Sequence, residues 1–180
     1  MSAATLPARA PAITGWRHLR AIALLPFMNT VVVPSALLVL SAPRAHEATT
    51  LTVLAGLALL GAGAALVAHS IQMFVTLGRG TLAPWDPTRT LVTAGAYRYT
   101  RNPMKAGLFL VLAGEALLFR SLALTGWLAG FAAANVVYIR VAEEPGLLQR
   151  FGERYGDYCA RVPRWWPTLR ALRAANQENT

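Results

Sequence analysis

Four long apolar runs constrain this 180-residue chain more than any other feature of its sequence. The composition, 55% hydrophobic and 14% charged residues, is typical of proteins that cross a bilayer. At about 1.5 Å per residue, helices of about 20 residues cross a hydrocarbon core of ~30 Å. We therefore expect an all-α integral membrane helical bundle that forms a single domain over residues 1–180. Its four transmembrane helices are expected near residues 21–42, 51–77, 103–119 and 122–139.

Residues within and between these apolar runs indicate how the helices are kinked and joined. The first run is too long for the apolar part of a signal peptide, so we expect a retained helix. Pro26 and Pro34 should kink it, with Asn29 and Thr30 placed to meet the freed backbone groups. The third run is short, and a tight turn at residues 120–121 should join it to the fourth as a helical hairpin.

Positive charge lies almost entirely on one side of the predicted spans. Of the 17 Lys and Arg residues, only Arg44 and Arg120 fall on the other side of a four-span arrangement. This asymmetry predicts that both termini and the central loop are cytoplasmic. The net charge of +9 is scattered between apolar runs and does not form one basic face. We therefore expect membrane lipids as partners and no nucleic acid.

The segment over residues 140–180 is charged and amphipathic. Apolar and aromatic side chains recur in it at helical spacing, which predicts a cytoplasmic amphipathic helix lying on the membrane or on the protein. Trp165 and Trp166 follow it and are expected to anchor it at the membrane interface. The residues of the apolar face are Leu147, Leu148, Phe151, Tyr155 and Tyr158.

Two polar clusters border the last two spans. The basic segment, residues 95–107 (GAYRYTRNPMKAG), places Arg98, Arg101 and Lys105 at the start of the third span. After the fourth span, Arg140 and the pair Glu143–Glu144 stand at helical spacings that put them on one side of a helix end. These charges could form surface ion pairs of little energetic value. They could equally bind a zwitterionic ligand. An arginine would then bind its carboxylate, and a glutamate would bind its ammonium group or ribose hydroxyls.

The remaining polar residues and motifs give weaker indications of a functional site. The sequence holds no dinucleotide-type glycine motif, phosphate loop, paired-histidine zinc motif or nucleophile elbow. Cys159 is the single cysteine, and we expect an ordinary thiol near the surface and no metal site. Glu115 lies inside an apolar span, where a carboxylate needs a partner, and we favour a structural role beside Arg120. For His69 we expect a polar lining or an interhelical hydrogen bond.

Residues 78–167 resemble the isoprenylcysteine carboxyl methyltransferase family of membrane enzymes, whose wider circle includes phosphatidylethanolamine N-methyltransferases. The resemblance rests on an ordered set of features. These are the block LVTAGAYRYTRNPM, a hairpin of two spans, the spacing of Arg140, Glu143 and Glu144, the block FGERYGDY, and VPR before a proline.

The resemblance implies an S-adenosyl-L-methionine-dependent methyltransferase with its cofactor pocket at the cytoplasmic ends of the final helices. It implies that Arg140 lies near a substrate carboxylate and that Arg101 and Asn102 belong to the catalytic centre. Arg89 and Thr90 match the segment that leads into the pocket. The implied cofactor-binding residues are Leu91, Val92, Tyr97, Arg101, Asn102, Pro103, Met104, Glu143, Glu144, Gly61 and Gly63.

Two positions depart from the family pattern. Asn102 stands where the carboxyl methyltransferases usually have histidine, and asparagine cannot titrate near neutral pH. Lys105 stands where an aromatic residue is common, which removes a contact to a sulfonium. Tyr97 or Tyr99 could supply that contact.

The sequence therefore predicts a membrane methyltransferase acting on a lipophilic acceptor that enters from the bilayer. The acceptor atom belongs to a carboxylate, a thiol or an amine. The lack of a poised general base favours an acid, a thiol or an already neutral acceptor. One alternative is a non-catalytic membrane protein that binds anionic lipid headgroups through its basic loop. Another is a membrane reductase with a nicotinamide cofactor.

Overall fold

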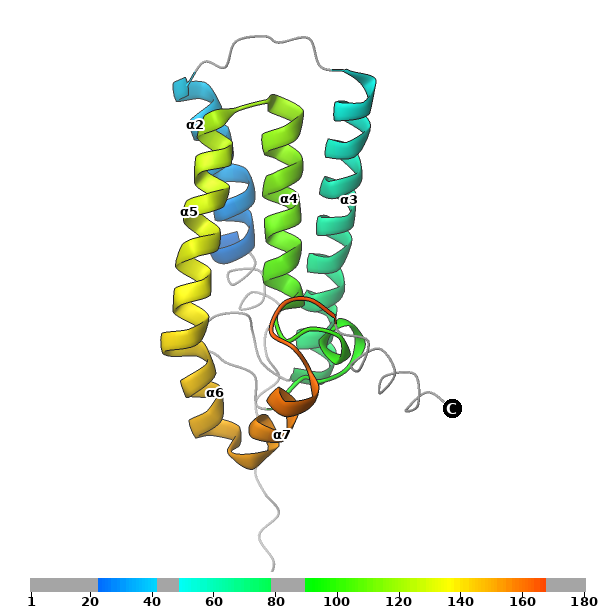
Figure 1. The fold of residues 1–180 in the computed structure, drawn as a ribbon, viewed down its shortest axis with the longest axis vertical. Helices are drawn as coiled ribbons and strands as arrows, with labels where there is room; N and C mark the ends of the chain where they lie inside the picture. Colours follow the sequence, from blue (N-terminus) through cyan, green and yellow to red (C-terminus); the bar gives the residue numbers. More distant parts are fainter. Residues whose placement is uncertain (1–22, 42–48, 79–89, 168–180) are drawn as a thin grey trace, which may run out of the picture.

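The computed structural model describes residues 23–41, 49–78 and 90–167, and these residues form helices and connecting segments without a β-strand (Figure 1). The all-α prediction is therefore confirmed for the described part of the chain. Its helical segments are η1 (Ala23–Val32), α2 (Val33–Ser41), α3 (Thr50–Met73), η2 (Phe74–Gly78), η3 (Gly95–Arg98), α4 (Pro103–Phe119), α5 (Leu122–Tyr138), η4 (Ile139–Glu143), α6 (Glu144–Phe151) and α7 (Glu153–Arg161).

The long helices follow the predicted apolar runs closely. Two of them, Thr50–Gly78 with 29 residues and Leu122–Phe151 with 30, are long and apolar enough to cross a membrane. The apolar helix Pro26–Ser41 is shorter, and α4 has 17 residues. The crossing of a membrane by these two shorter helices stays a prediction.

Small residues bring α3 and α4 into close contact in the centre of the bundle. A methyl group added to Gly63 would lie 2.6 Å from the Gly107 carbonyl oxygen and 2.7 Å from the Val111 nitrogen. A methyl group on Gly114 would similarly lie 2.7 Å from the Gly56 carbonyl oxygen. The two backbones are therefore packed as closely as glycine allows, as in other membrane helix pairs.

The first helix is tied to the bundle through its irregular start. The η1 segment is π-helical and contains Pro26, whose carbonyl accepts a hydrogen bond of 2.8 Å from the Thr30 hydroxyl. The Trp127 indole of α5 donates to the Asn29 carbonyl at 3.1 Å. The predicted contact of Asn29 and Thr30 with backbone groups freed by the prolines stays a prediction, because the carbonyl that Thr30 meets is that of Pro26 itself.

The predicted hairpin joins α4 to α5. Arg120 ends α4 with a left-handed φ of 47°, and the buried Ser121 side chain caps α5 by accepting from the Leu124 amide at 3.4 Å. A cavity of about 350 Å³ lies at this end, lined by Thr49, Arg120 and Ser121 among others. Nearby in α4, the Oε2 atom of Glu115 is buried and accepts no hydrogen bond within the described residues.

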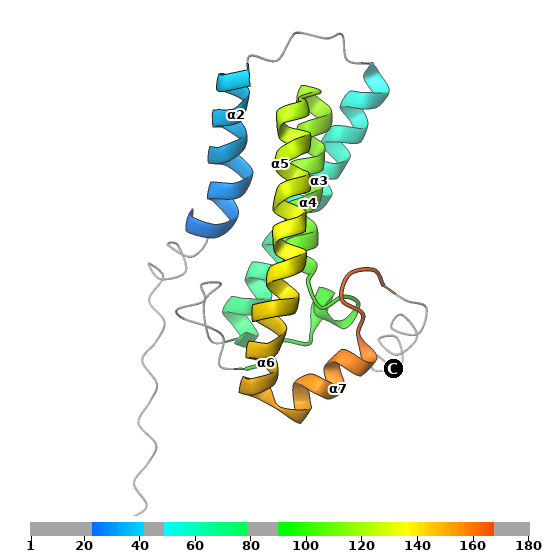
Figure 2. The ribbon, with the colours of Figure 1, turned by 60° about the vertical axis from the view of Figure 1, so that its left-hand side comes forward.

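The prediction of one amphipathic helix after the fourth span was wrong in its extent. The helix of α5 continues through η4 into α6, and the chain then turns at Gly152, whose φ is 55°. Such a backbone favours glycine because it lacks a Cβ atom. As Figure 2 shows, α7 turns away from the α5–α6 axis at the end of the bundle opposite the α4–α5 turn.

This turn decides which aromatic residues are buried. Tyr155, Tyr158 and Val162 form a buried cluster beneath the start of α4, whereas Leu148 of the predicted apolar face is 52% exposed. The Trp165 ring lies against Phe109 with centroids 5.6 Å apart. The α7 face therefore packs on the protein.

Candidate functional site

The basic segment is held on one side by α3. The Ala96 amide donates to Nε2 of His69 at 3.3 Å, and Gly95 adopts a φ of 60° directly beside that imidazole. The Tyr97 ring is buried and meets Phe74 edge to face, with centroids 5.6 Å apart. His69 therefore forms the predicted type of tertiary hydrogen bond, with a backbone group as its partner.

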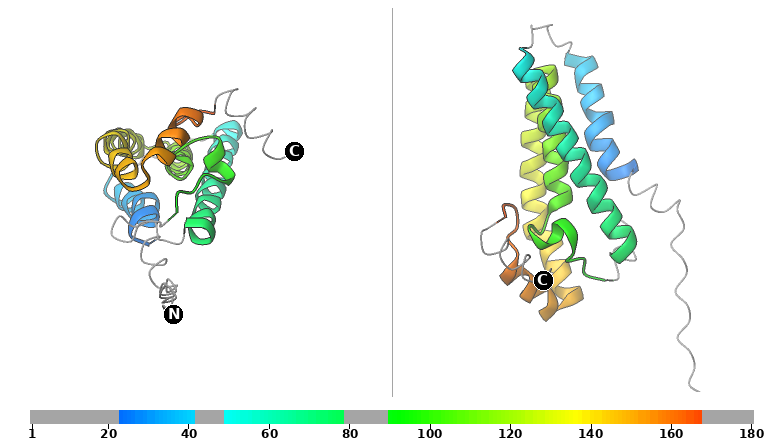
Figure 3. Two further views of the ribbon diagram at one scale, coloured as in Figure 1. Left: turned by 90° about the horizontal axis from the view of Figure 1, so that it is seen from below. Right: turned by 90° about the vertical axis from the view of Figure 1, so that its right-hand side faces the viewer.

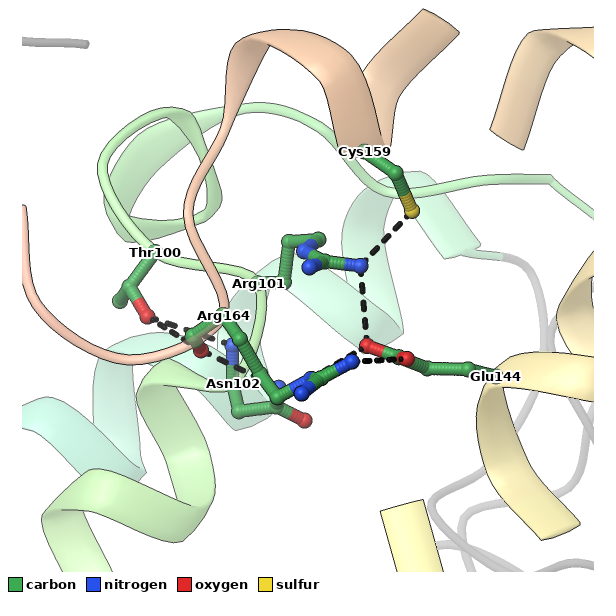
Figure 4. A network of polar contacts seen from close by, with 6 residues as sticks. All are labelled: Thr100, Arg101, Asn102, Glu144, Cys159 and Arg164. Carbon is green, nitrogen blue, oxygen red and sulfur yellow. Dashed lines mark hydrogen bonds and ion pairs between the residues drawn. The ribbon is translucent and has the colours of Figure 1, made fainter. Parts of the chain in front are cut away.

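The segment after α7 holds the basic segment on its other side. Its Pro163 carbonyl accepts from the Arg101 amide at 2.9 Å. Its Arg164 carbonyl accepts from both the Thr100 hydroxyl at 3.0 Å and the Asn102 side-chain amide at 3.2 Å (Figure 4). Residues 100–102 and 163–164, distant in sequence, thus form one fixed unit.

Glu144 lies between two guanidinium groups, as Figure 4 shows. Its Oε1 atom accepts from Nη1 of Arg101 and from Nε of Arg164, both at 2.9 Å. Its Oε2 atom accepts from Nη2 of Arg164 at 2.6 Å. We call these three residues the arginine–glutamate cluster. It combines two positive charges with one negative charge, and its side chains are only 13% to 28% exposed.

Contacts within the arginine–glutamate cluster shift the pKa values of Glu144 and Arg164. Glu144 lies beyond the apolar part of the α5 helix, in its polar extension. The hydrogen bond from Arg164 lowers the pKa of the Glu144 carboxyl, burial opposes this effect, and the charge of Arg101 adds to it. The same hydrogen bond raises the pKa of Arg164. Glu144 is therefore a stable carboxylate at neutral pH.

A second ion pair lies one residue earlier. Lys105 on the first turn of α4 pairs with Glu143, and its Nζ atom also lies 5.2 Å from the centre of the Tyr138 ring. The adjacent carboxylates Glu143 and Glu144 thus each meet one cation of the basic segment. These contacts join the start of α4 to the end of the α5 helix.

Three buried tyrosines surround this region. The Tyr158 hydroxyl donates to the Tyr97 carbonyl at 2.7 Å. Burial is the main cause that raises the pKa of Tyr97, Tyr155 and Tyr158. Their phenols therefore stay protonated at neutral pH.

The structure brings only some of the predicted site residues together. Arg101, Asn102, Glu143 and Glu144 lie in or beside the arginine–glutamate cluster, with Pro103 fully buried at the start of α4. Met104 follows Pro103 in the first turn of α4. Leu91 packs on the buried tyrosine cluster, and Val92 and Tyr97 are buried.

Other predicted residues lie apart from the cluster. Arg140 is exposed, although its charge adds a smaller contribution to the lowered pKa of Glu144. Gly63 is part of the contact between α3 and α4. Gly61 lies on an exposed face, where an added methyl group would contact nothing within 4 Å. Arg89 lies outside the described residues, while Thr90 is described and exposed.

Sequence reasoning missed three members of the site. Arg164 and Thr100 occur in the sequence analysis only inside motifs, and neither was given a role of its own. Cys159 is a free thiol of intermediate exposure, and the contact that its expected place near the surface did not predict is the 2.8 Å distance from its Sγ atom to Nη1 of Arg101. The spacing of Tyr155, Cys159 and Val162 on one helix face was the signal that could have placed this thiol inside.

Chelation of a metal ion finds no support in this region. The described residues hold no group of three or more histidine, cysteine, aspartate and glutamate side chains that could bind a metal ion.

Residues 51–154 match the family model of the phospholipid methyltransferases. Because the match covers more than half of the chain, this protein belongs to the phospholipid methyltransferase family. The resemblance to membrane methyltransferases seen in the sequence is therefore confirmed. Together with the two long apolar helices, the family identifies a membrane protein.

One similar protein is methanethiol S-methyltransferase 2 from Bradyrhizobium diazoefficiens. It is 34% identical over 112 residues, which cover 61% of this chain and 39% of the relative. The matched region thus spans well under half of that protein's length. No solved structure matches the chain.

Proposed function

We propose that this protein is an integral membrane methyltransferase that uses S-adenosyl-L-methionine. The observation that carries the proposal is the arginine–glutamate cluster. It joins the start of α4, the end of the α5 helix and the segment after α7 at one end of the bundle. These are the segments that carry the family resemblance, and residues 51–154 match the family.

The chemistry of the cluster fits this cofactor. The amino-acid part of S-adenosyl-L-methionine carries a carboxylate and an ammonium group, which require cationic and anionic partners. Arg101 retains a buried Nε atom that has no hydrogen-bond partner among the described residues. Oε2 of Glu144 accepts one hydrogen bond from the cluster, so it can accept another. The site therefore offers donors and an acceptor to a zwitterion.

The chain's own residues would bind and orient the reactants. When bound, the cofactor supplies an activated methyl group on a sulfonium, and no protein nucleophile is required. Transfer breaks the carbon–sulfur bond of that methyl group and forms its bond to the acceptor atom. The protein would then contribute the alignment of the methyl donor with the acceptor.

We propose a thiol or carboxylic acid on a lipophilic molecule as the acceptor. Near the cluster, Glu143 and Glu144 are ion-paired and His69 accepts from a backbone amide, so none of these three is poised as a general base. A carboxylate, or a thiolate that has already lost its proton to water, needs no such base. The S-methyltransferase relative gives independent support for a thiol.

We propose four membrane spans with both termini in the cytoplasm. The support is the inside-positive charge pattern and the agreement of the helices with the four apolar runs. The cluster then faces the cytoplasm, where the cofactor is found. The acceptor reaches it sideways from the bilayer.

Titration calorimetry with S-adenosylhomocysteine tests this proposal. The purified protein should bind the compound, and Glu144→Ala should abolish binding because it leaves two arginines unpaired in the site. Arg101→Lys should weaken binding, since one ammonium cannot replace a forked guanidinium. Absence of binding by the unmodified protein would contradict the proposal. A protein that only binds anionic headgroups would tolerate Arg101→Lys.

A further inference from the structure

We propose that Arg164 and Arg101 form a carboxylate-binding subsite to which Arg140 does not belong. The carboxylate is that of the amino-acid part of the methyl donor, so this inference rests on the proposed function. The structure supports it through the donors that the two arginines leave unused, the way Arg164 is held, and the position of Arg140.

The first support is the geometry of the arginine–glutamate cluster. Arg164 places Nε and Nη2 on Glu144, and within the described residues its Nη1 atom stays available for another acceptor. Arg101 places Nη1 on Glu144 and keeps its buried Nε atom without a hydrogen-bond partner among the described residues. Two guanidinium groups share one carboxylate, so the cluster keeps one positive charge. A second carboxylate would neutralise it and satisfy the remaining donors.

The second support is the fixation of Arg164. Two side chains of the basic segment, Thr100 and Asn102, donate to its carbonyl oxygen at 3.0 and 3.2 Å. The next residue, Trp165, packs on Phe109. A surface arginine rarely has its backbone held in this way, and pre-organised donors bind ligands with less loss of entropy. Asn102 is thus a positioning residue that acts through Arg164.

The third support is the placement of the other cations. Arg140 is exposed on η4 and takes no part in the network of Figure 4. Lys105 is engaged with Glu143 and with the Tyr138 ring. Arg164 is therefore the cation best placed to complete a bidentate carboxylate site with Arg101. This assignment also gives Glu144 a definite task, because its carboxylate aligns the two guanidinium groups.

The test compares two ligands that differ by the amino-acid part. S-adenosylhomocysteine carries the carboxylate, whereas 5′-methylthioadenosine lacks the whole amino-acid group. Dissociation constants for both are measured by titration calorimetry with the unmodified protein, with Arg164→Gln and with Arg164→Lys. Arg161→Gln serves as the matched control, because Arg161 is exposed on α7 and, among the described residues, donates to the Asp157 carbonyl of its own helix.

We expect Arg164→Gln to weaken S-adenosylhomocysteine binding about tenfold or more, the effect of losing a charged hydrogen bond. Binding of 5′-methylthioadenosine should be unchanged, and Arg164→Lys should show a smaller loss for the first ligand alone. Arg161→Gln should change neither. Thermal unfolding of each variant in detergent shows that it is folded.

Two results would overturn the inference while the proposed function stands. One is an equal loss of affinity for both ligands in Arg164→Gln and Arg164→Lys. The other is unchanged binding of S-adenosylhomocysteine in both variants. Failure of the unmodified protein to bind either ligand would instead overturn the proposed function itself.

Discussion

Glu144 accepts three hydrogen bonds from Arg101 and Arg164, and this makes its charge the most sensitive property of the site. A neutral amide at this position could accept fewer bonds and would leave two guanidinium groups beside each other. Replacing Glu144 should lower the stability of the folded protein as clearly as it lowers the affinity for the ligand, because the side chain of Glu144 is only 17% exposed.

The first prediction concerns pH. The pKa of Glu144 lies below its usual value of 4.5 in the folded protein. The ionised carboxylate of Glu144 therefore stabilises the folded protein. This stabilisation is complete above the unfolded-state pKa of Glu144 and is lost as the pH falls through its lowered folded-state pKa. At pH 7, Glu144→Gln should be less stable by about 1.5 to 3 kcal/mol. Thermal unfolding of both proteins in detergent between pH 7 and pH 3 measures the difference.

The difference in stability between the two proteins should narrow in acid, since protonation removes the same charge from the unmodified protein. Glu153→Gln is a suitable control, because Glu153 is exposed at the start of α7. A difference that stays constant down to pH 3 would show that the charge of Glu144 is not the source of its stabilising effect.

Single residues also show where the sequence was informative about the site. The residues at 101–102 were predicted through the family resemblance, and the pair at 143–144 was also visible in the charge spacing at a helix end. Arg164 could not be predicted in this way, because its role depends on the turn at Gly152 and on two side chains that bind its carbonyl oxygen. The same turn brings the partly buried Cys159 next to Arg101, a contact that the sequence did not predict.

At the level of elements, the contact between α3 and α4 organises the described bundle. This contact separates two glycines that the family resemblance had joined as one motif. Gly63 lies against α4, and Gly61 faces away from it. Their different surroundings give a direct comparison within one helix.

The second prediction concerns these two glycines. Gly63→Ala should destabilise the protein by about 1 to 3 kcal/mol, because the new methyl group would meet backbone atoms that cannot rotate away. Gly61→Ala should be neutral or stabilising by up to about 1 kcal/mol, as expected from helix propensity. Thermal unfolding in one detergent measures both. Equal stability of the two variants would contradict the close packing of α3 on α4.

The helices themselves were largely predictable. The third predicted span, 103–119, coincides with α4, and the other runs agree with their helices within a few residues over the described part of the chain. Apolar length and a proline at the first turn determine such boundaries locally. The break between α6 and α7 was missed because Gly152 is an isolated glycine in an otherwise helical pattern. Only tertiary packing of the tyrosines shows why the chain turns there.

Viewed as a whole, the molecule has two distinct ends. In the right-hand view of Figure 3, α6 and α7 lie at one end and the α4–α5 turn lies at the other. The arginine–glutamate cluster belongs to the first end, because Glu144 begins α6 and Arg164 follows α7. The distribution of Lys and Arg predicts that the first end is cytoplasmic, as proposed above. This orientation is what gives a cytoplasmic cofactor access to the proposed site.

The third prediction tests this orientation. In a Cys159→Ser background, Leu122→Cys at the α4–α5 turn should react with an impermeant maleimide added to intact cells. Arg150→Cys on α6 should react only after the membrane is opened. Both residues are exposed on the protein, so burial does not limit either reaction. The opposite labelling pattern would reverse the proposed topology.

The most direct test of the central claim is transfer of a labelled methyl group. The protein in liposomes is incubated with methyl-labelled S-adenosyl-L-methionine and a lipid-soluble extract that includes thiols and acids. We predict labelled, lipid-soluble product with the unmodified protein and none with Glu144→Ala. If the unmodified protein, folded and inserted, transfers no label and instead oxidises a nicotinamide cofactor, the methyltransferase assignment is contradicted.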